Sequence, residues 1–586
     1  MTPHEPTDRA ASANALPDLP ARGECDSVPV TTPSRSTSDA VLFVASAIVT
    51  VAILVWIRSL RAAQESHGLT PIFYYLFAFL DYTGTFAALI VLVGAWFVAR
   101  SRAMTRVPRW VGQHPTAFAV ANAAVLALAA QVVYRAHPLS MDEYTVLFQS
   151  EVFAAGKLAG QFPPSLLDWL VPRAHTWFFA SSPEGQVATL YWPSFSLILT
   201  PFTWLGIPWA CNPVLSGITL VVIHRLALRV FGNADSAGAA VLLTAASPVF
   251  LADGISYYSM TAHMLANAVF ALLLLEPTTK RLLAAGLVGS IALTLHNPFH
   301  HFLFALPWLV WLAFRPGAVR NLAFLAAGYL PLTLLLGLGW FWFQSGLMGD
   351  GANAGPYGPS QIGSAFAWPT AQLLFARLVG LAKVWLWAVP GMMLLAAYGF
   401  WKWRHDHRVA LLGASAVATL VGFLATWVEQ GHGWGFRYFH SAWFALPLLA
   451  VAAFTPLSST KDEQQSATAL RSFMVACTLL TLVISVPLRA LQIRDFMDDH
   501  LAQLPHYSGS EPRVVFVDTE ASLYGLDLLQ NDPFLRSRVL RLPSYGAEVN
   551  AAVMKDLQPS FRRVYSDRYG EVWSAAEPAQ GRAADQ

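Results

Sequence analysis

The sequence predicts an all-α polytopic membrane protein with roughly 13 transmembrane helices, further helices in the membrane interface and a small C-terminal α/β domain. Three observations predict this fold class. Of the 586 residues, 55% are hydrophobic and only 12% are charged, whereas about a quarter of the residues in a soluble domain are charged. Apolar runs of about 18 residues or more, each long enough to cross a bilayer, recur along the chain. Arg and Lys cluster between these runs, as expected of cytoplasmic loops.

The N-terminal segment 1–38 is rich in Pro, Ser and Thr and lacks the apolar stretch of a signal peptide. We expect a disordered cytoplasmic tail there, followed by a membrane domain over residues 39–491. The predicted spans lie near residues 39–59, 72–99, 115–135, 209–231, 234–252, 257–276, 280–297, 298–314, 320–343, 373–400, 408–428, 437–455 and 471–491.

The basic residues also predict the orientation of the chain. The arginine-rich loop 100–114 should be cytoplasmic, which places the loop 136–208 outside. A full crossing by the apolar segment 187–206 would break the alternation of later basic loops. Because that segment also contains two prolines, we expect an interfacial helix or a partial crossing. These features predict a multi-pass protein of the bacterial plasma (inner) membrane. Its N-terminus should be cytoplasmic, and a second outer loop should lie at 344–372.

The tail 492–586 changes character and predicts a small extracytoplasmic α/β domain. Segments 513–518 and 538–542 resemble strands, because they are short and rich in Val and Leu. We expect helices over 519–530 and 546–558, and one or two more strands over 561–573.

Composition also excludes some classes of function. The net charge of +2 is too small to indicate a nucleic-acid-binding protein. The three cysteines lie far apart in the chain, so we predict neither a disulfide framework nor a thiolate metal site.

The leading candidates for chemistry are Asp142 and Glu143, which follow the third predicted span within a few residues. The segment that follows predicts an amphipathic helix along the membrane surface. Neighbouring helical residues point about 100° apart, so the two carboxylates should have different roles. In the alternative interpretation, both simply cap an interfacial helix.

A carboxylate pair after a span, followed by a helix that ends in a Gly-containing turn, resembles the first outer loop of GT-C glycosyltransferases. That superfamily includes protein O-mannosyltransferases and aminoarabinose transferases, and the likeness is to glycosyltransferase family 39. The segment YWPSF at 191–195, the small and apolar run 212–251 and the segment GFRYFHSAWFALPLLA at 435–450 follow in the expected order. The resemblance covers roughly residues 120–455 and rests on order and spacing.

The resemblance implies inverting transfer of a sugar from a polyprenyl-phosphate donor to a lipid, glycan or protein acceptor on the outer face. It implies that Asp142 is the base or orients the acceptor, with Glu143 supporting it, and it permits a divalent cation. Tyr191 and Trp192 would then belong to the substrate site. A second acid is common in the family, but Asp253 precedes its expected position.

Tyr257, Tyr258 and His263 are alternatives to that acid, although a lone histidine in a span more often belongs to the core. The turn 296–301 contains His296 and His300, which could bind phosphate or sugar, hold a metal ion, or only pack at helix ends.

Arg437 has the strongest claim to the phosphate, because it begins an outer helix and a guanidinium matches phosphate geometry. The residues that should share this wall are His432, Trp434, Tyr438 and His440. In the alternative interpretation, Arg437 extends toward lipid headgroups.

Two other function classes remain open. A transporter or flippase of lipid-linked glycans should carry ionisable groups at mid-membrane, where Asp81 and Lys383 are predicted to lie. A polysaccharide polymerase or ligase usually has a large late loop that is rich in Arg and His. The loop 344–372 lacks both residue types.

Overall fold

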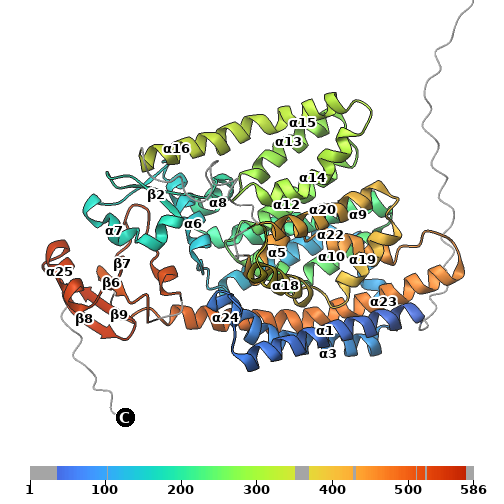
Figure 1. Cartoon of the computed structure of the whole chain (residues 1–586), viewed down its shortest axis with the longest axis horizontal. Coiled ribbons are helices and arrows are strands. Elements are labelled where there is room, and N and C mark those ends of the chain that lie inside the picture. Colours follow the sequence, from blue (N-terminus) through green and yellow to red (C-terminus); the bar gives the residue numbers. More distant parts are fainter. Residues whose placement is uncertain are drawn as a thin grey trace, which may run out of the picture. The chain divides into compact units, whose positions relative to one another are not determined.

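The computed structural model describes residues 36–101, 103–349, 368–426, 431–507, 509, 511–521 and 524–575. These residues form a mostly helical protein with a small C-terminal sheet (Figure 1). The predicted fold class is therefore confirmed. The predicted disordered tail and most of the predicted loop 344–372 lie outside the described residues.

Seven helices among the described residues are long and apolar enough to cross a membrane, and an eighth span exists if one bent pair is counted. They are Thr37–Ala63, Pro71–Val98, Pro115–Val132, Pro208–Phe231, Ala318–Met348, His407–Leu424 and Lys461–Leu501. The bent pair joins α10 (Ala234–Ala245) to α11 (Pro248–Ile255) at an angle of 63°. The expected count of about 13 spans is not confirmed, because several predicted spans are shorter helices or are broken.

The predicted single span 373–400 shows why such a count fails. It consists of α18 (Ala371–Leu386) and α19 (Met392–Lys402), which are separated by a break that contains Pro390 and Gly391. Proline removes a backbone donor and disfavours helix at the residue before it. Gly391 has a φ of +87°, a conformation that glycine adopts at a lower steric cost than other residues.

The remaining helices of the membrane region are shorter than the predicted spans. They are α12 (Met260–Leu274), α13 (Thr279–Leu293), α14 (Phe299–Ala313), α22 (Ala445–Ala453) and the four-residue α21 (Arg437–His440).

The two ends of the membrane domain pack together. Helix α1 (Thr37–Ala63) contacts α3 (Tyr82–Val98) and α23 (Lys461–Val483), and α24 (Ser485–Leu501) also contacts α3 (Figure 1). Within this group, Asp81 Oδ2 lies 2.8 Å from Lys383 Nζ, and Asp81 Oδ1 lies 2.8 Å from Arg489 Nη2. The three side chains are fully buried, so they form an ion cluster inside the helix bundle.

The loop 136–208 contains α6 (Met141–Ala154), α8 (Ser194–Trp204) and a small antiparallel sheet. The strands of this sheet are β1 (Gly160–Gln161), β3 (Gln186–Thr189) and β2 (Phe179–Ser181), in that order. Helix α8 has 11 residues, so it rises only about 16 Å and is too short to cross about 30 Å of hydrocarbon by itself. The start of the expected helix 187–206 is instead part of strand β3 (Gln186–Thr189).

The expectation of an amphipathic surface helix at α6 is wrong, because α6 is buried on more than one side. Met141, Tyr144 and Phe148 form one stripe that shares a core with residues of the C-terminal domain. Val146 points to another side, where it packs with residues of α8 and its neighbours. Apolar residues on two sides of the helix therefore bury it between two partners.

The C-terminal domain has a four-stranded sheet in the order β7-β6-β9-β8, in which only β6 and β7 are parallel. Its elements are β6 (Arg513–Val517), β7 (Val539–Pro543), α25 (Ala547–Leu557), β8 (Arg562–Asp567) and β9 (Gly570–Ser574). The four strands and helix α25 lie where the sequence predicts strands and a helix. The expected helix 519–530 is wrong: its described part contains only the 3₁₀ turn η6 (Gly525–Leu528).

Candidate functional site

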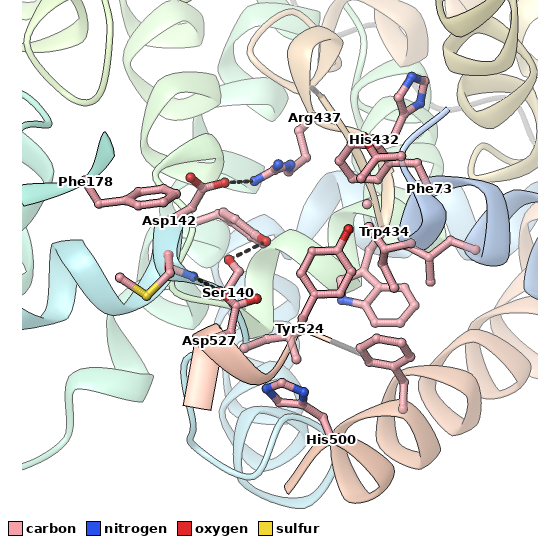
Figure 2. Close-up of a pocket in the computed structure, with 18 residues that line it drawn as sticks. Phe73, Ser140, Asp142, Phe178, His432, Trp434, Arg437, His500, Tyr524 and Asp527 are labelled. Carbon is pink, nitrogen blue, oxygen red and sulfur yellow. Dashed lines mark hydrogen bonds and ion pairs between the residues drawn. The ribbon is translucent and has the colours of Figure 1, made fainter. Parts of the chain in front are cut away.

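A pocket of about 210 Å³ lies between several elements of the fold (Figure 2). These elements are α6, α2 (Pro71–Tyr75), the hairpin before α21 and the C-terminal domain. One part of its wall is polar and the other is apolar. The polar part includes Ser140, Asp142, Tyr258, His432, Arg437, His500 and Asp527. The apolar part includes Ile72, Phe73, Leu76, Leu139, Phe178, Trp434 and Phe496.

Asp142 lies in the first turn of α6 and faces the pocket (Figure 2). Its Oδ2 accepts a hydrogen bond from Arg437 Nη1 at 2.8 Å, and its Oδ1 accepts one from the Tyr191 hydroxyl. Burial favours the protonated acid, but the Arg437 charge and the hydrogen bonds outweigh burial and hold the pKa of Asp142 below its usual value. Asp142 is therefore an ionised carboxylate in this state.

A glycine-rich hairpin places Arg437 opposite Asp142. Strands β4 (His432–Gly433) and β5 (Gly435–Phe436) pair, and the Arg437 amide donates a hydrogen bond to the Gly431 carbonyl at 2.7 Å. Gly431 and Gly435 have φ values of +116° and +81°, which explains the glycine spacing in this segment. Helix α21 begins at Arg437 directly after the hairpin.

The Arg437 side chain is mostly buried, with an exposed fraction of 13%. Its guanidinium lies over the Tyr258 ring, 4.4 Å from the ring centre. Within the described residues, Arg437 Nε has no hydrogen-bond partner. These contacts do not match the alternative in which Arg437 extends to lipid headgroups.

Glu143 points away from the pocket and organises the chain around it. Its carboxylate accepts hydrogen bonds from the amides of Leu139, Ser140 and Tyr257 at 2.9, 3.2 and 2.9 Å. It also accepts one from the Tyr134 hydroxyl at 3.0 Å. Burial raises its pKa to about 7, although the hydrogen bonds act in the opposite direction. The two neighbouring acids thus differ in position, as their helical spacing predicts.

Two further predicted residues adjoin Asp142 without lining the pocket. Tyr191 donates the hydrogen bond described above, and its ring centre lies 4.2 Å from that of His296. His296 lies close enough that a proton on its ring would lower the pKa of Asp142. Both residues therefore belong to the wall behind the carboxylate.

The Tyr257 and Trp192 side chains lie outside the pocket. Tyr257 donates its hydroxyl to the Ala136 carbonyl at 2.9 Å and is buried. Trp192 packs near Gly337. The neighbouring Tyr258, rather than Tyr257, lines the pocket and bonds Ser140 Oγ at 2.9 Å.

Tyr438, His300 and His263 form a layer behind Arg437. The Tyr438 ring stacks on Phe423 at 4.4 Å, and the His300 ring lies 6.0 Å from Tyr438. The His263 ring lies 4.8 Å from that of His300, and both histidines are buried. Neither ring nitrogen of His263 has a hydrogen-bond partner among the residues that the structure describes. Asp253, the one acid in the segment where a second acid was sought, is buried too, 2.8 Å from His440 Nδ1 but without hydrogen-bond geometry.

The pocket also includes residues that the sequence did not single out. His500, Tyr524 and Asp527 come from the end of α24 and the C-terminal domain (Figure 2). Asp527 Oδ1 accepts a hydrogen bond from the Met141 amide at 3.0 Å. The only signal in the sequence is an acid within the apolar stretch YGLDLL, which does not by itself indicate a site.

The described residues contain no group of three or more His, Cys, Asp or Glu side chains arranged to hold a metal ion. Arg437 and Tyr191 already occupy both Asp142 oxygens. The side chains in their present arrangement therefore do not fit the divalent cation that the resemblance permits.

Comparison with known proteins supports the fold. No family model and no curated protein matches the chain. The structure of ArnT from Cupriavidus metallidurans bound to undecaprenyl phosphate matches with 13% identity and a TM-score of 0.51, covering 78% of this chain and 98% of that one. The apo structure of ArnT from the same organism matches with 14% identity and a TM-score of 0.49, covering 79% and 98%. At 13% identity, the first match shows that the two chains share a fold, as the resemblance implies.

Proposed function

We propose that this protein is an inverting glycosyltransferase of the GT-C type, which moves a sugar from a polyprenyl-phosphate carrier to an acceptor outside the membrane. The observation that carries the proposal is the buried pair of Asp142 and Arg437 in one pocket, beside an apolar wall. ArnT, which has this fold, has been solved with undecaprenyl phosphate bound. A lipid-phosphate substrate needs both a cationic group and an apolar surface, and the pocket offers both.

Arg437 is the proposed phosphate ligand. Its guanidinium bonds Asp142 through Nη1, and Nε has no partner within the described residues. A guanidinium presents five donors, so it can bind a phosphate while it still contacts a carboxylate. In a buried site, such a charged hydrogen bond contributes more than it would in water.

Asp142 is the proposed base. In the resting site, Arg437 keeps the proton affinity of Asp142 low. A bound phosphate anion would share the Arg437 charge and raise the proton affinity of Asp142. The carboxylate could then take the proton from an acceptor hydroxyl as its oxygen bonds the anomeric carbon. The bond from that carbon to the phosphate oxygen breaks, and its electron pair leaves with the phosphate.

The remaining predicted residues have supporting roles in this proposal. Glu143 fixes the chain before α6, and Tyr191 orients the Asp142 carboxylate from behind. His296, His300, His263 and Tyr438 form the polar layer that adjoins Asp142 and Arg437.

The transporter alternative is less well supported. The mid-membrane groups on which it depends are Asp81 and Lys383, and Asp81 is paired with both Lys383 and Arg489. Because each cation of this cluster has the same carboxylate as its partner, helix packing is a sufficient explanation for the cluster.

The proposed function can be tested with the full-length protein in lipid nanodiscs. Binding of undecaprenyl phosphate would be measured first. Transfer of label from a panel of polyprenyl-phosphate-linked radiolabelled sugars to a membrane extract would follow. We expect saturable binding and transfer of at least one sugar. Absence of both would refute the function, and movement of intact donor across a vesicle membrane without transfer would favour a flippase.

A further inference from the structure

The C-terminal domain contributes a carboxyl group to the pocket. Asp527 lies in the 3₁₀ turn η6 and lines the pocket with Asp142 (Figure 2). Its Oδ1 accepts the Met141 amide hydrogen bond, while no residue described in the structure bonds its Oδ2. One oxygen is therefore used to hold the domain, and the other is available to a ligand.

The position of Asp527 is fixed by a built interface. The hydroxyl of Tyr144 donates to the Asn531 carbonyl at 2.6 Å, and the Asn531 amide donates back at 2.8 Å. Gln530 Nε2 donates to the Pro138 carbonyl at 2.8 Å. Apolar side chains of α6 and of the C-terminal sheet share one core. These contacts hold the residues that follow Asp527 directly against the chain around Asp142.

The two carboxyl groups of the pocket have different environments. Asp142 has both oxygens engaged, by Arg437 and Tyr191. Asp527 has no hydrogen-bonded cation in the described structure. Burial raises the pKa of Asp527 to about 8, and the charges of Asp142 and Glu143 add to this rise. At neutral pH, Asp527 is therefore a neutral acid whose Oδ2 can donate a hydrogen bond, since Oδ1 accepts one.

We propose that Asp527 binds the acceptor, by donating a hydrogen bond from Oδ2 to an acceptor oxygen on the side of the pocket opposite Arg437. The inference rests on the proposed function and deepens it. Arg437 and Asp142 serve the donor phosphate and the proton, and the C-terminal domain selects an oxygen-bearing acceptor. Asp527 would be the second acid of the site, in place of Asp253, which is buried beside His440.

Asparagine and alanine substitutions separate this role from a structural one. D527N keeps an oxygen for the Met141 amide and offers an amide donor in place of the acid proton. D527A loses both. We expect D527N to retain the apparent KM for acceptor at pH 7 and D527A to raise it at least about tenfold. The matched control is D556N, because Asp556 is an exposed acid of the same domain on α25.

A pH titration of the wild type tests the same role without a substitution that removes the contact to the Met141 amide. Ionisation of Asp527 removes the donor but keeps the Oδ1 acceptor. If only the neutral form binds, the apparent KM for acceptor in the wild type rises about tenfold between pH 7 and pH 9. D527N should stay within about twofold over that range. The comparison with D527N corrects for the other ionisable groups that line the pocket, which are Asp142, Tyr258, His432, Arg437, His500 and Tyr524, and for the adjacent Glu143.

The measurements also separate the inference from the proposed function. The acceptor probe is a membrane extract from cells that lack the protein, titrated by mass, and donor affinity is followed with undecaprenyl phosphate. Equal pH profiles for wild type and D527N would overturn the inference while transfer itself persists. Equal loss of donor affinity and acceptor affinity in D527A would also overturn it. A wild type that neither binds undecaprenyl phosphate nor transfers sugar would fail at the proposed function.

Discussion

Arg437 Nη1 lies 2.8 Å from Asp142 Oδ2, although 295 residues separate them in the chain. The pair joins the first outer loop to the hairpin before α21 and forms the polar centre of the pocket. Five predictions follow from this site and from the interactions that support it.

Asp142→Asn should lower sugar transfer by about 10²-fold or more while the protein still folds and inserts. The amide keeps the size of the carboxylate but cannot accept a proton. Initial rates would be measured at saturating donor, with Asp168→Asn as control, since Asp168 is an exposed acid of the same loop. Transfer at the wild-type rate would remove the base assignment.

Arg437→Ala should weaken undecaprenyl phosphate binding about ten- to a hundredfold, since a charged hydrogen bond contributes about 1.5 to 3 kcal/mol. Arg437→Lys should restore only part of the affinity, because the charge remains and the planar fork is lost. Binding isotherms in nanodiscs would report this, with the exposed Arg173→Ala as control. An unchanged affinity in Arg437→Ala would place the phosphate elsewhere.

Glu143→Gln should reduce stability by about 1 to 3 kcal/mol, because the new amide group faces hydrogen-bond donors only. The midpoint of thermal unfolding in detergent would fall, and protease sensitivity before α6 would rise. Glu548→Gln is the control, since Glu548 is exposed on α25. If unfolding is unchanged and only transfer is lost, Glu143 has a direct chemical role instead.

The contribution of Glu143 and Asp527 to stability should fall as pH rises from about 6.5 to 8. Glu143 and Asp527 have folded-state pKa values of about 7 and about 8, both above their usual values. In this window the folded state holds protons on these carboxyl groups that the unfolded chain has released, so the two groups lower the free energy of unfolding as pH rises. Below it, buried histidines act in the opposite direction, because burial lowers the pKa of His137 to about 3 and that of His175 to about 4. Thermal unfolding at several pH values would measure the slope, and D527N should make it shallower. An equal slope in the wild type and D527N would contradict the shift of Asp527.

Asp81→Asn should destabilise the bundle more than Lys383→Met. The first change leaves two buried cations without an anion and should cost about 3 to 5 kcal/mol. The second leaves the Asp81 and Arg489 pair intact. Yield of folded protein and thermal midpoints would rank the variants. If both variants fold normally but change the movement of lipid-linked sugars, the cluster has a transport role.

The membrane class of the protein and its α/β tail could be predicted from the sequence, which also singled out Asp142, a residue that lines the pocket. Hydrophobic run length predicts spans because the bilayer thickness is nearly constant. The same rule overestimated the count, since it does not detect breaks such as that at Pro390 and Gly391. Likewise, the sequence pattern of α6 predicted an amphipathic surface helix, because the pattern does not reveal its second partner, the C-terminal domain.

The sequence by itself determined that Asp142 and Glu143 would differ, because adjacent helical residues point in different directions. It also singled out Arg437, because a cation at the outer start of a helix is unusual. Only the tertiary structure decided that Asp142 and Arg437 meet, that Tyr258 rather than Tyr257 lines the pocket, and that Asp527 joins them. These contacts span hundreds of residues, so they depend on how helices and domains pack, which local sequence patterns do not encode.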